Sequence, residues 1–416
     1  MHLLLAPEKV ITSTLKETWI KSGSKNMILF TAGDNQSYCD LMQDWNGKIF
    51  KHIEFFKNYA TNDLIGLRAT ELAKQYKISR IIPMAEADIL RAANLREKLG
   101  VEGQSIENAI LFRDKIAMKR YAQRYDIAVP KFKCIKDTVD IINFIEEVGY
   151  PIVIKPIMGR GSLNTLVIKN ELELCDLLNS GLISDTSRYS DLLAEEFIES
   201  EIYHLDGLQL NGKVTVMSVA KYINNCLAFV NGAYLGSYTL SSDNHLKNKL
   251  LQFGYHLLES VFPLPKNSLF HIELFVDKHG NIRLCEIACR LGGNGINDEV
   301  MLQQGIDIKM EYIRAECGLP FFSEQGTLFS KKAHIAARVL IPPEEGKLLD
   351  IPQQCNLNGV LRYESRGKAG NSYRKMQMSN NEIANFLLAG DNELEIQEKI
   401  NAVISWFYHH AKWETT

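Results

Sequence analysis

The sequence of 416 residues predicts a mixed α/β (α+β) fold built from several packed units. Two observations support this prediction. Across residues 1–110, short apolar runs alternate with helix-like segments, a pattern typical of a parallel sheet covered by helices. Further along, strand-like runs occur in pairs around turn-prone residues, as in antiparallel hairpins. A chain of this length is long enough for two or three units that each bury a core.

The composition argues against several classes of protein. Hydrophobic residues make up 46% of the chain and charged residues 23%, so disorder is not expected. The formal charge of -3 gives no electrostatic reason to expect a nucleic acid or a membrane surface as a partner, and no apolar stretch approaches the roughly 20 residues that cross a bilayer. Residues 1–7 lack a basic segment, so they predict a buried strand and not a signal peptide. The eight cysteines are scattered without a C-x-x-C pair, which favours reduced thiols and a cytoplasmic location.

Residues 1–110 predict a Rossmann-like domain without a cofactor of its own. Met27–Phe30 and residues 78–83 are apolar runs of strand length. From Glu86 onward the apolar residues recur at helical spacing, and Gly100 suits the end of that helix. No G-x-G-x-x-G follows a strand, so the dinucleotide-binding fingerprint is absent. We interpret Glu86 as a helix cap; the alternative is that it faces a cleft.

Two capped helices open the second unit. Asp114 can cap a helix that runs to about Tyr125, and Asp137 can cap another that stops at Gly149. An apolar strand, Ile152–Pro156, follows them.

Hairpins are expected in the middle of the chain, and a separate unit is expected at its end. The Asn-Gly pairs at 211–212 and 231–232 favour type I′ turns. From about residue 330 the composition shifts, with a strand at 333–341 that two prolines end. A final helix is predicted from five apolar residues that share one face: Ile396, Ile400, Val403, Ile404 and Phe407.

Two acidic residues, Glu273 and Glu286, interrupt apolar strands on either side of a turn at 277–281. The turn places the strands side by side, so we expect the two carboxylates to be neighbours. Strand alternation puts His271 on the same face as Glu273. Buried carboxylates are costly without a cation, and Mg²⁺ prefers carboxylates together with phosphate oxygens and water. The alternative is an ordinary hairpin whose acids face solvent.

Two further motifs are individually weak. Lys155 ends an apolar strand and precedes the glycine-containing segment 158–162, where backbone N–H groups could approach phosphates closely. This segment is not a Walker A loop, because no G-K-[ST] follows, and a solvated turn is the alternative. An apolar strand near residue 192 breaks into an acidic linker at 195–201 and then resumes; a charged surface connection is the alternative there.

In combination these motifs resemble the ATP-grasp superfamily over about residues 115–318, and within it the amino-acid (carboxylate–amine) ligases. The motifs follow one another in the order Arg113-Asp114-Lys115, Lys155 with its glycines, Glu195-Glu196-Phe197-Ile198, Glu273, Glu286 and Arg290. The two acids stand thirteen residues apart, with the arginine four residues later, which is a spacing of this family. The segments Tyr203–Gly207 and Arg290–Gly293 support the closer placement.

The resemblance implies an ATP-grasp fold with an N-terminal Rossmann-like domain and a C-terminal lid subdomain. The implied divisions are residues 1–110 for the N-terminal domain, 111–198 for the small subdomain with the glycine loop, 199–330 for the large subdomain with the metal site, and 331–416 for the C-terminal subdomain.

The resemblance also implies roles for individual residues. The residues expected to contact ATP are Lys115, Lys155, the glycine loop Gly159, Arg160, Gly161 and Ser162, and the linker residues Glu195, Glu196, Phe197, Ile198 and Glu201. Glu273 and Glu286 would bind two Mg²⁺ ions, for which Mn²⁺ would substitute, and Arg290 would stabilise the acyl phosphate. His271 would contact phosphoryl oxygens or accept a proton, unless a neighbouring strand satisfies it, and His204 is interpreted as structural. Many members have Asn where this chain has Ala288, which leaves the coordination of the second metal open.

The activity implied is that of an ADP-forming ligase, which activates a small-molecule carboxylate as an acyl phosphate and joins it to an amine. A different acceptor, the thiol of an acyl carrier protein, is equally compatible with the motifs. A non-catalytic ATP-binding regulator and a biotin carboxylase also share this fold, although no biotinyl-carrier segment is visible. No nucleic-acid or membrane partner is expected, and a homodimer is implied by the resemblance alone.

Overall fold

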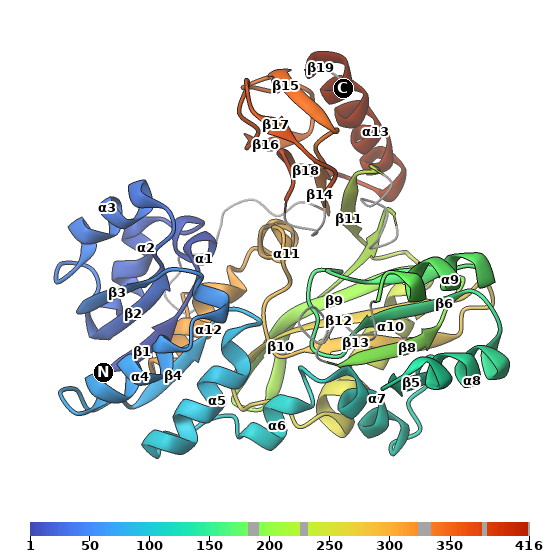
Figure 1. The fold of residues 1–416 in the computed structure, drawn as a ribbon. Coiled ribbons are helices and arrows are strands. Elements are labelled where there is room, and N and C mark those ends of the chain that lie inside the picture. The colour runs from blue at the N-terminus through green and yellow to red at the C-terminus, as the bar shows by residue number, and fades with distance from the viewer. Residues whose placement is uncertain (182–190, 225–231, 323–333, 377–380, 415–416) are drawn as a thin grey trace.

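The fold is described from a computed structural model over residues 1–181, 191–224, 232–322, 334–376 and 381–414. In Figure 1 an N-terminal unit and a C-terminal unit flank a larger middle unit, and α11 lies between all three. None of the helices within these ranges combines the length and the apolar character that a bilayer crossing requires.

The N-terminal unit contains a four-stranded parallel sheet in the order β3-β2-β1-β4, which confirms the predicted parallel sheet. Its strands are β1 (His2–Leu5), β2 (Met27–Ala32), β3 (His52–Phe56) and β4 (Arg80–Pro83). Its helices are α1 (Glu8–Thr12), α2 (Lys16–Lys21), α3 (Gln36–Trp45), α4 (Leu64–Ala73), α5 (Asp88–Leu99) and α6 (Ile106–Ile110). Helices α4 and α5 cover one face of the sheet, and the core on the other face includes residues of α12. The N-terminal unit is therefore packed against the middle unit through α12.

The small subdomain is a four-stranded antiparallel sheet, in the order β5-β8-β6-β7, with helices packed against it. Its elements are α7 (Lys115–Gln123), β5 (Phe132–Ile135), α8 (Thr138–Val148), β6 (Ile152–Pro156), β7 (Leu166–Ile168), α9 (Glu171–Asn179) and β8 (Leu192–Glu196). Both predicted caps are confirmed, because the side chains of Asp114 and Asp137 accept hydrogen bonds from the first turns of α7 and α8. Gly149 ends α8 with a φ of 75°.

An eight-stranded sheet forms the centre of the molecule, in the order β13-β12-β9-β10-β11-β14-β18-β16. Its strands are β9 (Glu201–Leu210), β10 (Lys213–Tyr222), β11 (Leu235–Thr239), β12 (Ser268–Val276), β13 (Ile282–Ala288), β14 (Ile335–Ile341), β16 (Val360–Ser365) and β18 (Ala384–Gly390). The predicted turn between β9 and β10 is confirmed: Asn211 and Gly212 have φ angles of 51° and 78°, as a type I′ turn requires. The second predicted Asn-Gly turn includes Asn231, which lies outside the described residues.

Helices cover both faces of this sheet, and a small second sheet completes the C-terminal unit. These helices are α10 (Lys247–His256), α11 (Ile296–Gln304), α12 (Ile308–Glu316) and α13 (Glu393–His410). The second sheet has the order β17-β15-β19 and consists of β15 (Gly346–Asp350), β17 (Ser372–Tyr373) and β19 (Lys412–Glu414). Ile396, Ile400, Val403 and Phe407 are buried on α13 as predicted, whereas Ile404 is only partly buried. Strand β14 pairs with β11, so the central sheet continues across the expected boundary near residue 330.

Candidate active site

The two acids singled out by the sequence lie directly opposite each other in the central sheet. Glu273 of β12 pairs with Glu286 of β13, next to a register shift between Glu273 and Leu274. Their side chains are 20% and 21% exposed. The predicted pairing of the acids is confirmed, and the alternative that both carboxylates face bulk solvent is wrong.

Glu273 is held by two neighbours through the same oxygen. The Tyr222 hydroxyl donates to Oε1 at 2.9 Å, and His271 Nε2 lies 3.4 Å from it. Burial would raise the pKa of Glu273, but the hydrogen bonds and charge of His271, with the tyrosine hydroxyl, outweigh burial and lower the pKa to about 2. The carboxylate is therefore an anion in a fixed orientation.

Glu286 is paired with Lys115, which connects the metal-site strands to the glycine loop. Lys115 Nζ lies 3.2 Å from Glu286 Oε1 and donates to the Gly159 carbonyl at 3.0 Å. The lysine is 4% exposed, at the first position of α7. The structure thus brings the expected phosphate-binding lysine, the loop and one acid together.

Lys155 and Glu195 form a buried cluster with Lys119, a residue that the sequence interpretation missed. Glu195 pairs with Lys155 and, at 2.8 Å, with Lys119; the Glu195 side chain is 2% exposed. Burial would lower the pKa of Lys155, but the charge of Glu195 raises it above the ordinary value for lysine. This carboxylate is enclosed by two lysines and holds Lys155 in place. A contact of Glu195 with ATP stays a prediction.

Arg290 is held by Glu86, which comes from the N-terminal unit. The Glu86 carboxylate accepts hydrogen bonds from Arg290 Nε and from Arg113 Nη1, and Arg113 Nη2 donates to the Met158 carbonyl at 2.9 Å. Burial would raise the pKa of Glu86, but the charges of Arg290 and Arg113 lower it to about 2. The interpretation of Glu86 as a helix cap is wrong, because α5 begins after Ala87 without a side-chain cap, and Glu86 is a buried partner of two arginines.

Both ring nitrogens of His271 are engaged. Its Nδ1 lies 2.8 Å from Asp206 Oδ1, and the other oxygen of Asp206 lies 2.6 Å from His204 Nδ1. Burial would lower the pKa of His271, but the Asp206 charge raises it to about 9. A protonated imidazole can donate to phosphoryl oxygens but cannot accept a proton, so the expected phosphoryl contact of His271 stays a prediction. The contacts present are those of the alternative, a histidine satisfied by a neighbouring strand.

Glu201 points away from the acid pair. Residue 204 of β9 is opposite Glu273, and Glu201 is three residues earlier, so the pleat points Glu201 to the opposite face of the sheet. There Glu201 accepts hydrogen bonds from Tyr203 and Lys221, at 2.7 and 2.5 Å. The expected ribose contact of Glu201 stays a prediction.

The linker before β9 borders a cleft of about 800 Å³, which Phe197 and Ile198 line together with Glu201. The backbone N–H groups of Glu196 and Phe197 already donate to the carbonyls of Lys131 and Pro151, at 3.0 and 3.3 Å. These two N–H groups are therefore already used within the protein, and the expected contact of the linker with adenine stays a prediction.

The glycine loop, Gly159–Ser162, connects β6 to β7. Gly161 and Ser162 both have a φ of 57°. The Met158 and Gly159 carbonyls at the start of the loop are anchored by Arg113 and Lys115, as described above. The loop therefore has a fixed base beside Lys155.

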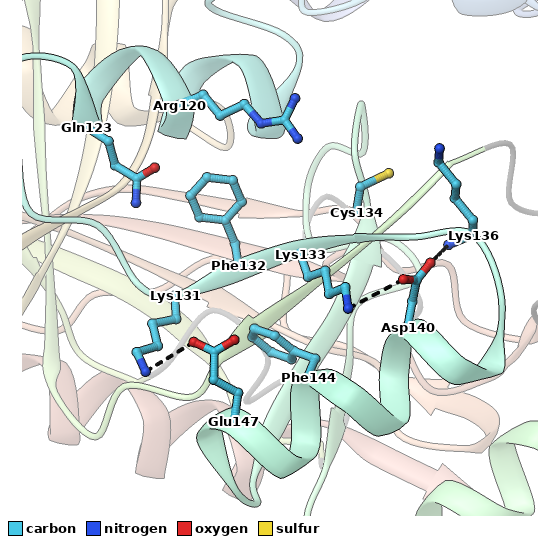
Figure 2. Close-up of a pocket in the computed structure, with 10 residues that line it drawn as sticks. All are labelled: Arg120, Gln123, Lys131, Phe132, Lys133, Cys134, Lys136, Asp140, Phe144 and Glu147. Atoms are coloured by element: carbon cyan, nitrogen blue, oxygen red, sulfur yellow. Dashed lines mark hydrogen bonds and ion pairs between the residues drawn. The ribbon is translucent and has the colours of Figure 1, made fainter.

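A separate groove of about 570 Å³ lies along the edge strand β5, between α7 and α8 (Figure 2). Lys131 pairs with Glu147 and Lys133 with Asp140 in this groove. It is lined by none of the candidate residues, so it is not part of this site.

The donors present fit a magnesium site. Two carboxylates on adjacent strands, each with one oxygen fixed by the protein, are the ligands that Mg²⁺ prefers when phosphate oxygens complete its shell. Lys155, Lys115 and Arg290 supply positive charge around them. Such an arrangement can bind a nucleoside triphosphate and stabilise charge on a transferring phosphoryl group.

Comparison with known proteins agrees with this geometry. Residues 148–298 match the family model described as ATP-grasp domain. The "L-arginine-specific L-amino acid ligase" of Bacillus subtilis is 26% identical over 345 residues, which are 82% of each chain. The "Alanine--anticapsin ligase" of the same organism is 22% identical, over 80% of this chain and 77% of that protein. The crystal structure of an L-amino acid ligase from Bacillus licheniformis has a TM-score of 0.74 at 15% identity, over 100% of this chain and 99% of that chain.

The fold, the paired acids and the matching domain define this chain as a member of the ATP-grasp superfamily. Within the superfamily its sequence places it among the amino-acid ligases.

Proposed function

We propose that this protein is an ADP-forming ligase that activates the carboxylate of an amino acid with ATP and joins it to an amine. The observation that supports this most directly is the pairing of Glu273 with Glu286, beside Lys115 and near enough to Arg290 for the charges of both acids to act on it. The relatives named as L-amino acid ligases support the choice of substrate class.

The reaction has two steps. In the first, a carboxylate oxygen forms a bond to the γ-phosphorus of ATP, while the bond from that phosphorus to the β,γ-bridging oxygen breaks and ADP leaves. In the second, the amine nitrogen bonds to the acyl carbon, the bond from that carbon to the phosphate oxygen breaks, and inorganic phosphate leaves as the amine loses a proton.

The main obstacle to the first step is the approach of two anions. Lys155 and Arg290 lower it by placing fixed positive charges where the transferring phosphoryl group develops charge, and such a donor is typically worth about 3 kcal/mol of barrier. Glu195 and Glu86 keep these two cations in place. The glycine loop would close over the phosphates and exclude water, which would otherwise hydrolyse the acyl phosphate.

Glu273 and Glu286 are the residues that would hold Mg²⁺, which would neutralise phosphate oxygens when bound. We propose two ions, with Mn²⁺ as a substitute, and Ala288 leaves the second ion without a protein ligand at that position. A homodimer and a cytoplasmic location are parts of the same proposal. The thiol of a carrier protein and a non-catalytic regulator are not favoured, because the relatives are named as ligases.

The test is ADP and phosphate release with a panel of amino acids, with hydroxylamine as a general acceptor to trap the acyl phosphate. We expect at least one amino acid to release ADP and phosphate together and to yield its hydroxamate. Glu286→Gln should lower turnover by at least about 100-fold, because it removes charge from a ligand of the metal. Glu147→Gln is the matched control, because that side chain is 59% exposed and outside the site. Unchanged ADP formation by Glu286→Gln would refute the assignment.

A further inference from the structure

Asp206 lies at the centre of a buried polar network next to the acid pair. Its side chain is 1% exposed, and its two oxygens lie 2.6 Å from His204 Nδ1 and 2.8 Å from His271 Nδ1. In the sheet, Asp206 is directly opposite His271, and His204 is directly opposite Glu273. All four side chains therefore point to the same face.

Two routes lead from Asp206 to Glu273, and both end on the same carboxylate oxygen. His271, held at Nδ1 by Asp206, places Nε2 3.4 Å from Glu273 Oε1. His204 packs against the ring of Tyr222 with centroids 4.6 Å apart, and the Tyr222 hydroxyl donates to the same oxygen at 2.9 Å. Holding Oε1 in this way leaves the other oxygen of Glu273 as the one that can face a metal.

The loop that carries Arg290 packs directly on the same network. A Cβ atom at Gly292 would overlap Asp206 Oδ1 and would lie 3.0 Å from His271 Nδ1. Only a residue without a side chain lets this loop approach so closely. The position of Asp206 is therefore coupled by contact to both the carboxylate and the arginine loop.

We propose that Asp206 is a positioning residue of the metal site, which fixes the orientation of Glu273 through His271 and, through His204, of Tyr222. This proposal rests on the proposed function, in which Glu273 and Glu286 bind the metal. Asp206 does not touch the metal or the substrate. It is needed because an unfixed carboxylate binds a metal less tightly than one held by a second shell of hydrogen bonds.

The experiment measures Mn²⁺ binding in the presence of ADP, from the electron paramagnetic resonance signal of free Mn²⁺. Asp206→Asn and His271→Gln should each weaken binding by about 10- to 100-fold, the range typical of partners behind metal ligands. The fold-loss in Mn²⁺ affinity of the double variant should be smaller than the product of the two single fold-losses, because both substitutions break the same connection from Asp206 through His271 to Glu273. Glu382→Gln is the matched control: its carboxylate is 1% exposed and pairs with Arg366, which lies in the same C-terminal unit, and with Lys9 of α1.

The outcomes separate this proposal from the function on which it rests. If Asp206→Asn binds Mn²⁺ as the parent does, if Glu382→Gln is equally impaired, or if the two single losses multiply, the proposal is overturned while the proposed function stands. If the parent does not bind Mn²⁺, or if Glu286→Gln binds it as tightly as the parent, the assignment of the metal site is wrong, and the proposal for Asp206 is wrong with it. Circular dichroism checks that each variant folds. If Asp206→Asn does not fold, His271→Gln decides the question alone, because His271 is the residue through which Asp206 contacts Glu273.

Discussion

Replacing Glu195 by Gln should destabilise the small subdomain strongly, although the change removes only one charge. The Glu195 side chain is 2% exposed, and its partners Lys119 and Lys155 are 0% and 12% exposed. Without the carboxylate, two buried ammonium groups would face each other with only a neutral amide between them. Breaking a buried ion pair by removing one partner costs about 3–5 kcal/mol, because the remaining charge stays buried without compensation. We expect a loss of unfolding free energy in that range, together with weaker ATP binding as Lys155 loses its anchor.

The assay is urea unfolding at pH 7, with Glu147→Gln as the matched control on the same subdomain. Glu147 and Lys131 are 59% and 56% exposed and lie 3.2 Å apart, so this substitution should cost less than about 1 kcal/mol. Adding Lys119→Met to Glu195→Gln should recover part of the loss, because it removes one of the two uncompensated charges. Equal losses for Glu195→Gln and Glu147→Gln would refute the reasoning.

Two further predictions concern the arginine loop and its partner. Gly292→Ala should lower the unfolding free energy by about 1–3 kcal/mol and should lower turnover, because its Cβ would overlap Asp206. Gly293→Ala should leave both unchanged, because nothing lies within 4 Å of a Cβ at that position. Thermal unfolding of the two variants checks this, and equal melting temperatures would contradict it. Glu86→Gln should cost about 3 kcal/mol at pH 7, the free energy that corresponds to lowering the pKa of Glu86 from 4.5 to about 2. Because the pKa of Glu86 is lowered in the folded state, this stabilisation is present above about pH 4.5 and is lost as the pH falls through about 2. The difference in unfolding free energy between the parent and Glu86→Gln, measured by urea unfolding, should therefore narrow over that range. A constant difference would argue against the pairing with Arg290.

That the two acids lie on neighbouring strands was predictable from the sequence, because the turn at 277–281 joins those strands. Their exact pairing was not, because the register set by the turn would place Cys285 opposite Glu273, and a register shift beside Glu273 places Glu286 there instead. The caps of α7 and α8 were predictable, since Asp114 and Asp137 bond to backbone groups three residues away. Short-range rules of this kind need no knowledge of the tertiary fold.

The partners of the acids were not predictable, because they come from distant parts of the chain. Glu86 meets Arg290 across 204 residues, and Asp206 meets His271 across 65. An acid before a helix, as at Glu86, ordinarily indicates a cap, and only the packing of the N-terminal unit on the middle unit shows otherwise. The face of the sheet on which Glu201 lies was not predictable either, because a shift of one residue in the register of β9 would reverse it.

The pairing of buried charges explains how the site exists before a nucleotide binds. Each of three cations expected to face phosphate already has a carboxylate partner: Lys155 with Glu195, Arg290 with Glu86, and Lys115 with Glu286. Unpaired, these buried cations would be strongly destabilising. Glu195 and Glu86 are sealed within the protein, so they can keep their partners when ATP arrives.

Glu286 differs from those two acids, because its side chain is 21% exposed and is itself expected to bind the metal. Magnesium and Lys115 therefore require the same carboxylate. When both magnesium and ATP are bound, Lys115 has to share this carboxylate or transfer its hydrogen bond to a phosphate oxygen. Because Lys115 also holds the Gly159 carbonyl, this exchange would connect occupation of the metal site to the base of the glycine loop.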